Sequence, residues 1–138
     1  MTRGAHRSEC AINRTLEVIG DRWSLLIIRD MMFGGKRHFC ELLACKEAIS
    51  SNILAARLKK LVDDGILTKA DDPTHKQKAV YSLTEHGIAL LPILTQMSQW
   101  GCEQLPAVEQ RSRRPRIPRS AAEVKRMTAA LRAAHLGR

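Results

Sequence analysis

The sequence predicts a mainly α protein that carries one small β-hairpin, an α+β fold class. Three observations support this prediction. Aromatic residues make up only 4% of the 138 residues, so the core must come from aliphatic side chains, which suit helices. Apolar residues recur at helical spacing over most of the chain. Beyond Gly65, this spacing gives way to two short strand-like runs that flank a turn-rich segment.

Two helices are expected before the middle of the chain. The first covers residues 10–19, whose apolar positions share one face, and Gly20 ends it. Asp21 can cap the second helix, in which the run Trp23–Phe33 is apolar around most of its circumference. Such a helix is buried on more than one side, so we expect it at the centre of the core. Gly34-Gly35 should end it.

A helix-turn-helix pattern comes next. Phe39–Ala44 predicts a short helix, and a five-residue connection leads to a longer one that Ser50 or Ser51 can cap and Gly65 can end. One face of the longer helix is apolar. Its other face begins small and polar and ends in lysines, in the order Ser51, Asn52, Ala55, Ala56, Lys59, Lys60. A helix that enters the DNA major groove needs this layout, although a surface helix with ordinary lysines would share it.

The two strand-like runs form a hairpin directly after this helix, which is the wing of a winged helix-turn-helix fold. They are Ile66–Ala70 and Lys78–Leu83, with the turn-rich segment Asp71–Gln77 between them. The tip carries a polar cluster suited to phosphate or minor-groove contact, namely His75, Lys76, Gln77 and Lys78. The alternative is a solvated loop tip.

A helix capped by Thr84 should follow and run to about Trp100, with Pro92 bending it or splitting it in two. Its apolar stripe is wider than one small domain can easily cover. We therefore expect a homodimer in which the first helix also takes part, unless the first helix covers the stripe within one chain. The predicted interface residues are Ile12, Leu16, Ile88, Leu91, Met97 and Trp100.

Charge sets the C-terminal end apart. The net charge is +9, and residues 111–138 hold nine Lys and Arg residues against one Glu. We divide the chain into a flexible N-terminus (1–9), a winged helix-turn-helix domain with dimerisation helices (10–104), a Pro/Arg-rich linker (105–119) and a C-terminal amphipathic helix (120–138). The arginines of the linker can serve as an auxiliary DNA contact, because each neutralised phosphate releases counterions, or they can simply be solvated.

The cysteines and the hydropathy exclude several classes of protein. The four cysteines form no Cys-x-x-Cys pair, so we expect free thiols and no metal or cofactor. No Cys–His arrangement stands out as a nucleophile with its base, so we expect no enzyme. There is no secretory leader, and no apolar run approaches the roughly 18–20 residues of a membrane span. We therefore expect a cytoplasmic protein without a membrane partner.

Three stretches resemble the HxlR-type regulators. The stretch Cys10–Asp30 looks like their opening, Ile49–Leu67 is similar to their recognition helix and first strand, and Tyr81–Pro92 resembles their wing-to-helix junction. The resemblance implies a winged-helix, homodimeric bacterial transcription regulator related to the MarR type, which dimerises through its first and last helices. Ala11 stands where such proteins often have Pro, and residues 111–138 exceed their usual length.

The same resemblance bears on the cysteines. Some members of the family sense oxidants or electrophiles through the cysteine that Cys10 matches, which makes Cys10 the candidate redox sensor and Cys45 its candidate partner. Cys10 opens a helix, whose dipole lowers a thiol pKa and favours the reactive thiolate. The alternative is a small buried residue at a helix start. Cys40 and Cys102 are expected to pack in the core.

The leading hypothesis is a homodimeric transcriptional regulator that binds a pseudo-palindromic operator, with half-sites about 10 base pairs apart. Asn52 is the candidate for bidentate readout of adenine, whereas Arg57 contacts DNA or is tied down inside the fold. The predicted DNA-binding residues are Arg37, Ser50, Ser51, Asn52, Ala55, Ala56, Arg57, Lys59, Lys60, His75, Lys76 and Lys78.

Two further expectations concern partners. The alternative to an operator-specific regulator is a winged-helix module that binds DNA non-specifically or binds a protein, with the basic tail as its main contact. A small-molecule or oxidant effector is also compatible with the chain, bound between the winged domain and the dimer helices. Its candidate lining residues, which can equally belong to the core, are Trp23, Met31, Met32, Met97 and Trp100.

Overall fold

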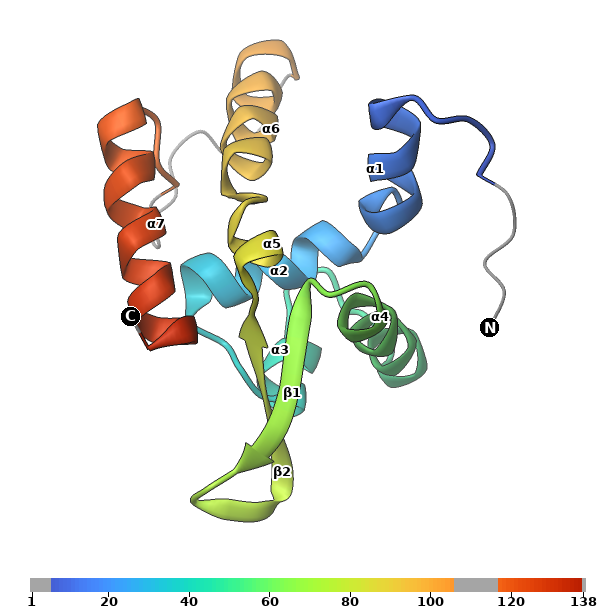
Figure 1. Cartoon of the computed structure of the whole chain (residues 1–138), viewed down its shortest axis with the longest axis vertical. Coiled ribbons are helices and arrows are strands. Elements are labelled where there is room, and N and C mark those ends of the chain that lie inside the picture. The colour runs from blue at the N-terminus through green and yellow to red at the C-terminus, as the bar shows by residue number, and fades with distance from the viewer. Residues whose placement is uncertain (1–5, 106–116, 138) are drawn as a thin grey trace.

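The computed structural model describes residues 6–105 and 117–137, and it shows a helical body from which one hairpin protrudes (Figure 1). This arrangement confirms the mainly α fold with a β-wing. The elements in chain order are α1 (Ala11–Ile19), α2 (Ser24–Gly34), α3 (Phe39–Leu43), α4 (Ser51–Asp63), β1 (Leu67–Asp72), β2 (His75–Leu83), α5 (Glu85–Ile88), α6 (Leu91–Gln104) and α7 (Ala121–Leu136).

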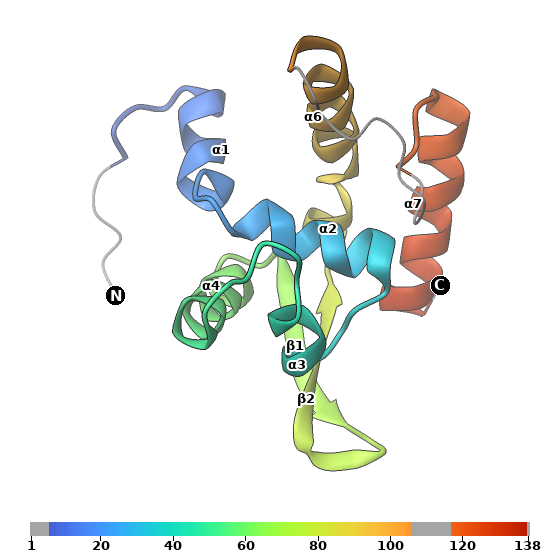
Figure 2. The ribbon, with the colours of Figure 1, turned by 180° about the vertical axis from the view of Figure 1, so that it is seen from behind.

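Helix α2 crosses the middle of the molecule, as Figure 2 shows from behind. It is buried on more than one side, because Ile27, Ile28, Met31, Met32 and Phe33 all lie in the core, and this confirms the predicted central helix. Its start is held by the Asp21 carboxylate, which accepts the backbone N–H groups of Trp23 and Ser24 at 2.9 and 3.0 Å. Its end is a left-handed Gly35.

The helix-turn-helix consists of α3, a tight turn and α4. The Ser50 hydroxyl accepts the N–H of Ile53 at 3.2 Å, so Ser50 is the cap of α4. Gly65 adopts a φ of +77° just beyond the helix, as expected from its lack of a Cβ. The buried stripe of α4 packs toward α2 and α3 and consists of Leu54, Leu58 and Leu61.

The wing is longer than predicted. Strands β1 and β2 pair antiparallel from Leu67 opposite Leu83 to Asp71 opposite Ala79, and after an irregularity Asp72 lies opposite His75. The predicted seven-residue turn was therefore too long. The Asp72 carboxylate accepts the N–H and the hydroxyl of Thr74 at 2.8 and 2.7 Å, which closes a tight turn and lets both strands continue to the tip.

The helix predicted after the wing is split in two at Pro92. This is one of the two outcomes that the sequence predicted, the other being a bend. Helix α5 ends at Ile88, and Pro92 stands at the beginning of α6, where its missing N–H removes no helical hydrogen bond. Ile88 and Leu91, on either side of the split, lie in the core, where they are 2% and 0% exposed. The prediction that these two residues lie at a dimer interface was therefore wrong.

Helices α1 and α6 project from the end of the molecule opposite the wing, and α7 stands beside α6 on the side away from α1 (Figures 1 and 2). His6 contacts Glu17 of α1, so the last residues of the predicted flexible N-terminus lie against that helix. Most of the predicted linker, residues 106–116, lies outside the described residues. Across 6–105 and 117–137, no helix has the length and apolar character needed to cross a membrane.

Candidate nucleic-acid interface

The leading turns of α4 form an exposed polar edge. Ser51, Asn52, Ala55 and Ala56 are all exposed. The amide of Asn52 has no hydrogen-bond partner within the part of the chain that the structure describes. Side chains this short allow another molecule to approach the helix backbone closely, and a free amide offers both a donor and an acceptor. The edge therefore has the chemistry needed to read base edges in a major groove.

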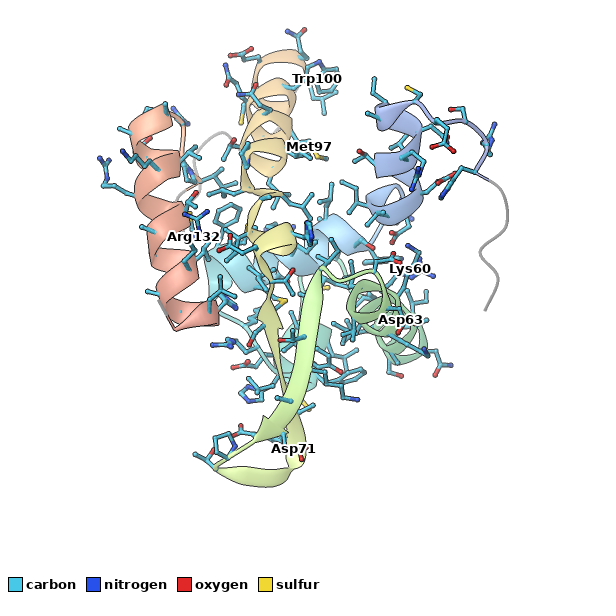
Figure 3. The ribbon with its side chains drawn as sticks, in the orientation of Figure 1. Lys60, Asp63, Asp71, Met97, Trp100 and Arg132 are labelled. Carbon is cyan, nitrogen blue, oxygen red and sulfur yellow. The ribbon has the colours of Figure 1, made fainter. Side chains whose placement is uncertain are left out.

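The two adjacent lysines at the end of α4 differ in their surroundings. The Lys59 side chain is 77% exposed and, among the residues that the structure describes, pairs only with Asp63 of the same helix, at 2.8 Å. The Lys60 ammonium donates to the carbonyls of Glu17 and Val18 at 3.0 and 3.3 Å, and Figure 3 shows it between α4 and α1. Since these carbonyls end α1, Lys60 stabilises the negative end of that helix. This bonding inside the fold argues against the predicted phosphate contact of Lys60.

The predicted phosphate contact Arg37 also lies inside the fold. Its Nε donates to the carbonyl of Tyr81 at 2.9 Å, its Nη1 donates to the carbonyl of Ala134 at 3.2 Å, and its Nη2 donates to the Ser82 hydroxyl. With its guanidinium used in this way, Arg37 is not a free cation, which argues against the predicted phosphate contact. The Arg57 guanidinium lies 3.8 Å from the Asp21 carboxylate, which favours the second of its two expected roles, a contact inside the fold.

Near the recognition helix and on the wing, three exposed lysines have no partner of their own among the described residues. Lys46 lies in the turn before α4, Lys69 lies on β1 and Lys78 lies on β2. None of the three has a hydrogen bond or ion pair with any described residue. Lys78 was predicted, whereas Lys46 and Lys69 were missed. Lys46 could have been predicted, because it lies in the connection of the predicted helix-turn-helix. The side chains of His75 and Lys76 lie outside the described part of the structure.

A histidine joins the start of the helix-turn-helix to the wing. The Nε2 of His38 lies 2.8 Å from the Asp72 carboxylate, and its Nδ1 lies 3.2 Å from that of Glu41. The Asp72 carboxylate, followed by that of Glu41, raises the pKa of His38. Hydrogen bonds from Thr74, and then the contact with His38, lower the pKa of Asp72 to about 2. The wing turn is thus tied to α3 by a charge-assisted contact.

The cysteines occupy different environments. Cys10 is exposed at the start of α1, and the backbone N–H of Asn13, followed by that of Ile12, lowers its thiol pKa. Cys45 is partly buried beside a cavity of about 10 Å³ that Trp23 and Leu42 also line, which is room for about one water molecule. Cys40 is exposed on α3, so its expected place in the core was wrong. The described residues contain no cluster of three metal-ligating side chains.

The end opposite the wing carries exposed apolar side chains. Ile12 and Leu16 of α1 are 72% and 58% exposed, and Met97 and Trp100 of α6 are 53% and 61% exposed. Figure 3 shows Met97 and Trp100 on the side of α6 that faces α1. Of the residues expected to line an effector pocket, Met31 and Met32 are buried in the core instead.

Known proteins share this arrangement. Residues 18–109 match the family model of HxlR-like helix-turn-helix proteins. The chain is 33% identical over 98 residues to the candidate regulatory protein MalR of Fusobacterium mortiferum, which covers 71% of this chain and 92% of MalR. It is 36% identical over 106 residues to the uncharacterized HTH-type transcriptional regulator Rv3095 of Mycobacterium tuberculosis, which covers 76% of this chain. That match spans 66% of the mycobacterial regulator, just under two thirds of its length.

Solved structures agree. PA1607, a candidate transcription factor, matches with a TM-score of 0.69 and 34% identity over 83% of each chain. The reduced form of the transcriptional regulator YodB from B. subtilis matches with a TM-score of 0.59 and 28% identity over 74% of this chain and 100% of YodB. The reduced form of the redox regulator HypR matches with a TM-score of 0.59 and 35% identity over 69% of this chain and 93% of HypR. YodB is also known in quinone-bound and diamide-treated forms, and HypR in an oxidised form.

Proposed function

Because the chain belongs to the HxlR-like helix-turn-helix family and is a transcriptional regulator of that type, we propose that it binds a pseudo-palindromic operator as a homodimer. The observation that carries this proposal is the exposed edge of α4, with the unbonded amide of Asn52, together with the exposed Lys46 in the turn before α4 and the exposed lysines of the wing. The protein acts in the cytoplasm, where its DNA is, and performs no catalysis.

Each part of the surface has a separate task in this proposal. The edge of α4 enters the major groove, where the Asn52 amide pairs with the N6 and N7 atoms of an adenine. Lys46, in the turn before this helix, and Lys59, in its second half, contact phosphates beside the groove. Lys69 and Lys78 of the wing contact the DNA phosphate backbone or enter the neighbouring minor groove.

The dimer is proposed from the apolar end of the molecule. Ile12, Leu16, Met97 and Trp100 are large apolar side chains exposed at the same end of the molecule, which is a feature of protein–protein contact surfaces. If the two-fold axis runs from this apolar end toward the wing, the side chains are buried against a second copy and both α4 helices lie on the side of the dimer away from the interface. This geometry supports half-sites about one helical turn, or 10 base pairs, apart.

The test of specific binding uses the DNA immediately upstream of the gene for this protein. Fluorescence anisotropy of the labelled fragment, with unlabelled competitor DNA, should show binding that a 100-fold excess of unrelated sequence, on the order of the usual specificity ratio, does not remove. Complete removal by the competitor would support the alternative of non-specific binding at that promoter, with the basic tail as its main contact.

We further propose that Cys10 senses oxidants. The exposed thiol, held as a thiolate more readily at the start of α1, supports this role, as do the reduced and oxidised or adducted forms known for HypR and YodB. Diamide takes two electrons and two protons from a pair of thiols and leaves them joined as a disulfide. We expect diamide to release the wild type from DNA by pairing Cys10 with Cys10 or Cys45 of the second protomer.

The cysteine test compares three variants after diamide treatment. Cys10→Ser should keep its DNA binding and give no covalent dimer on a non-reducing gel. Cys40→Ser is the matched control, because it removes another exposed thiol, and it should behave as the wild type. Cys45→Ser distinguishes the two disulfides proposed for Cys10: the covalent dimer persists if Cys10 pairs with Cys10 and is lost if Cys10 pairs with Cys45. If the covalent dimer survives in Cys10→Ser and disappears in Cys40→Ser, the sensor has been assigned to the wrong residue.

A further inference from the structure

Helix α7 lies beyond residue 109, where the match to the family model ends. It contacts the base of the wing, by which we mean the end of the hairpin where Leu67 pairs with Leu83. Its side chain Leu131 is 5% exposed and belongs to the common core. Three polar contacts supplement this packing. Arg37 donates to the carbonyl of Ala134, His135 accepts the N–H of Leu83, and Arg132 of α7 pairs with Glu85 of α5.

Arg37 joins three parts of the chain at this point. It precedes α3, and its carbonyl accepts the N–H of Tyr81 at 2.8 Å, which adds a third backbone segment beside β2. Its guanidinium returns to the same strand through the carbonyl of Tyr81 and the hydroxyl of Ser82, and it reaches α7 through the carbonyl of Ala134. A rotation of the wing about its base would have to break several of these hydrogen bonds together.

His135 holds the last residue of the wing. The N–H of Leu83 donates to its Nδ1 at 3.0 Å, and Leu83 is the residue at which β2 ends. This contact requires an unprotonated Nδ1, which the burial of the ring and the nearby Arg37 favour by lowering the pKa of His135 to about 4. The imidazole is therefore neutral at neutral pH and acts as an acceptor.

The length of the wing makes its base important. Strand β1 has six residues, so at about 3.3 Å per residue the tip lies about 20 Å from the base. A rotation of about 10° at the base then moves the tip by about 3 Å, which is several times the roughly 0.5 Å range of good hydrogen-bond distances. A two-stranded hairpin does not resist such bending by itself.

We infer that Arg37 and His135 are positioning residues for DNA binding, through which α7 holds the wing at the angle that brings Lys69 and Lys78 to the DNA. This inference rests on the proposed function, because it takes the wing lysines as DNA contacts. It differs from the original expectation for Arg37, since neither residue touches the DNA. The contact between His38 and Asp72 fixes the wing from the other side, at its turn.

The experiment measures operator affinity of the full chain for His135→Leu and His135→Asn. Leucine fills the space without an acceptor, whereas the Oδ1 of asparagine can accept the N–H of Leu83. We expect His135→Leu to bind about five- to tenfold more weakly and His135→Asn to bind within about twofold of the wild type. Arg132→Ala is the matched control on the same helix, because its ion pair is exposed, and it should change affinity less than about twofold.

Two readouts separate positioning from general destabilisation. First, each variant is repeated in a Lys69→Ala, Lys78→Ala background, where the loss caused by His135→Leu should shrink below about twofold because no wing contact remains to be misplaced. Second, Arg37→Lys keeps the positive charge but loses the planar guanidinium with its several N–H donors. It should weaken DNA binding without changing the slope of log affinity against log salt concentration. All measurements are made below the thermal transition of each variant.

The outcomes are distinguishable. If the wild type binds no DNA specifically, or the paired lysine variant binds as well as the wild type, the proposed function of the wing fails and the inference falls with it. The inference alone is overturned if the paired lysine variant binds DNA more weakly but His135→Leu causes the same loss of affinity in that background as in the wild type. It is also overturned if His135→Asn binds as weakly as His135→Leu. The contact between His38 and Asp72 would then be sufficient to position the wing.

Discussion

The leading edge of α4 and the base of the wing use polar side chains in opposite ways. Along the edge, the amide of Asn52 is exposed and has no partner in the described part of the chain. At the base, Arg37 and His135 are bonded to the backbone of β2. A group that the fold leaves unbonded is available to DNA, whereas a group bonded inside the fold sets the shape of the surface. Substitutions along the edge should therefore change affinity, and substitutions at the base should change stability or geometry.

The largest effect is expected from Gly87→Ala at the base of the wing. An added Cβ would lie 2.4 Å from the carbonyl oxygen of Ile66, which is backbone and cannot move aside cheaply. We expect the free energy of unfolding, measured in urea, to fall by about 3 kcal/mol. Gly34→Ala is the control, because its Cβ would only touch the Lys36 side chain at 3.7 Å. A loss below about 1 kcal/mol in Gly87→Ala would contradict this tight packing.

At the edge of α4, Asn52→Ala should weaken operator binding by about 10- to 100-fold, because it removes a bidentate base contact. Its free energy of unfolding should stay within about 0.5 kcal/mol of the wild type, since the side chain is exposed and unbonded. Binding to unrelated DNA should not change. Equal losses on operator and unrelated DNA would mean that Asn52 does not read a base.

A smaller effect at the base depends on pH. The pKa of His135 is lowered from 6.5 to about 4, first by burial and then by Arg37. The unfolded chain therefore takes up this proton at a higher pH than the folded chain. The stability from the neutral ring is complete above pH 6.5 and is lost as the pH falls toward 4. Between pH 7 and 4.5, the wild type should lose about 1–2 kcal/mol more unfolding free energy than His135→Asn. Parallel pH profiles for the two proteins would contradict this.

The smallest effect compares two lysines through the salt dependence of DNA binding. Lys46→Ala should reduce the slope of log affinity against log salt by about 0.9, because one phosphate contact is lost. Lys60→Met should leave the slope unchanged and instead lower the free energy of unfolding by about 1 kcal/mol, since Lys60 holds the end of α1. If instead Lys60→Met reduced the slope and Lys46→Ala left it unchanged, Lys60 would be the phosphate contact and Lys46 would not.

The order and type of the elements could be predicted because local chemistry decides them. Ser50, Gly35 and Gly65 act on the helix ends beside them, and the Pro92 ring splits the helix in which it stands. The exposed edge of α4 could be predicted for the same reason, since helical spacing alone separates its residues from Leu54 and Leu58. The length of the wing was underestimated, because the turn closes through the side chain of Asp72.

The tertiary structure decided which of the polar and apolar residues are available. Lys59 and Lys60 are identical neighbours in the chain, yet the 100° turn per helical residue leaves one in water and brings the other to α1. Ile88 and Leu91 lie on either side of the break between α5 and α6, and packing against the rest of the domain buries both. Arg37 reaches Ala134 across 97 positions of sequence, a contact that helical or strand periodicity cannot predict because those periods describe only neighbouring turns.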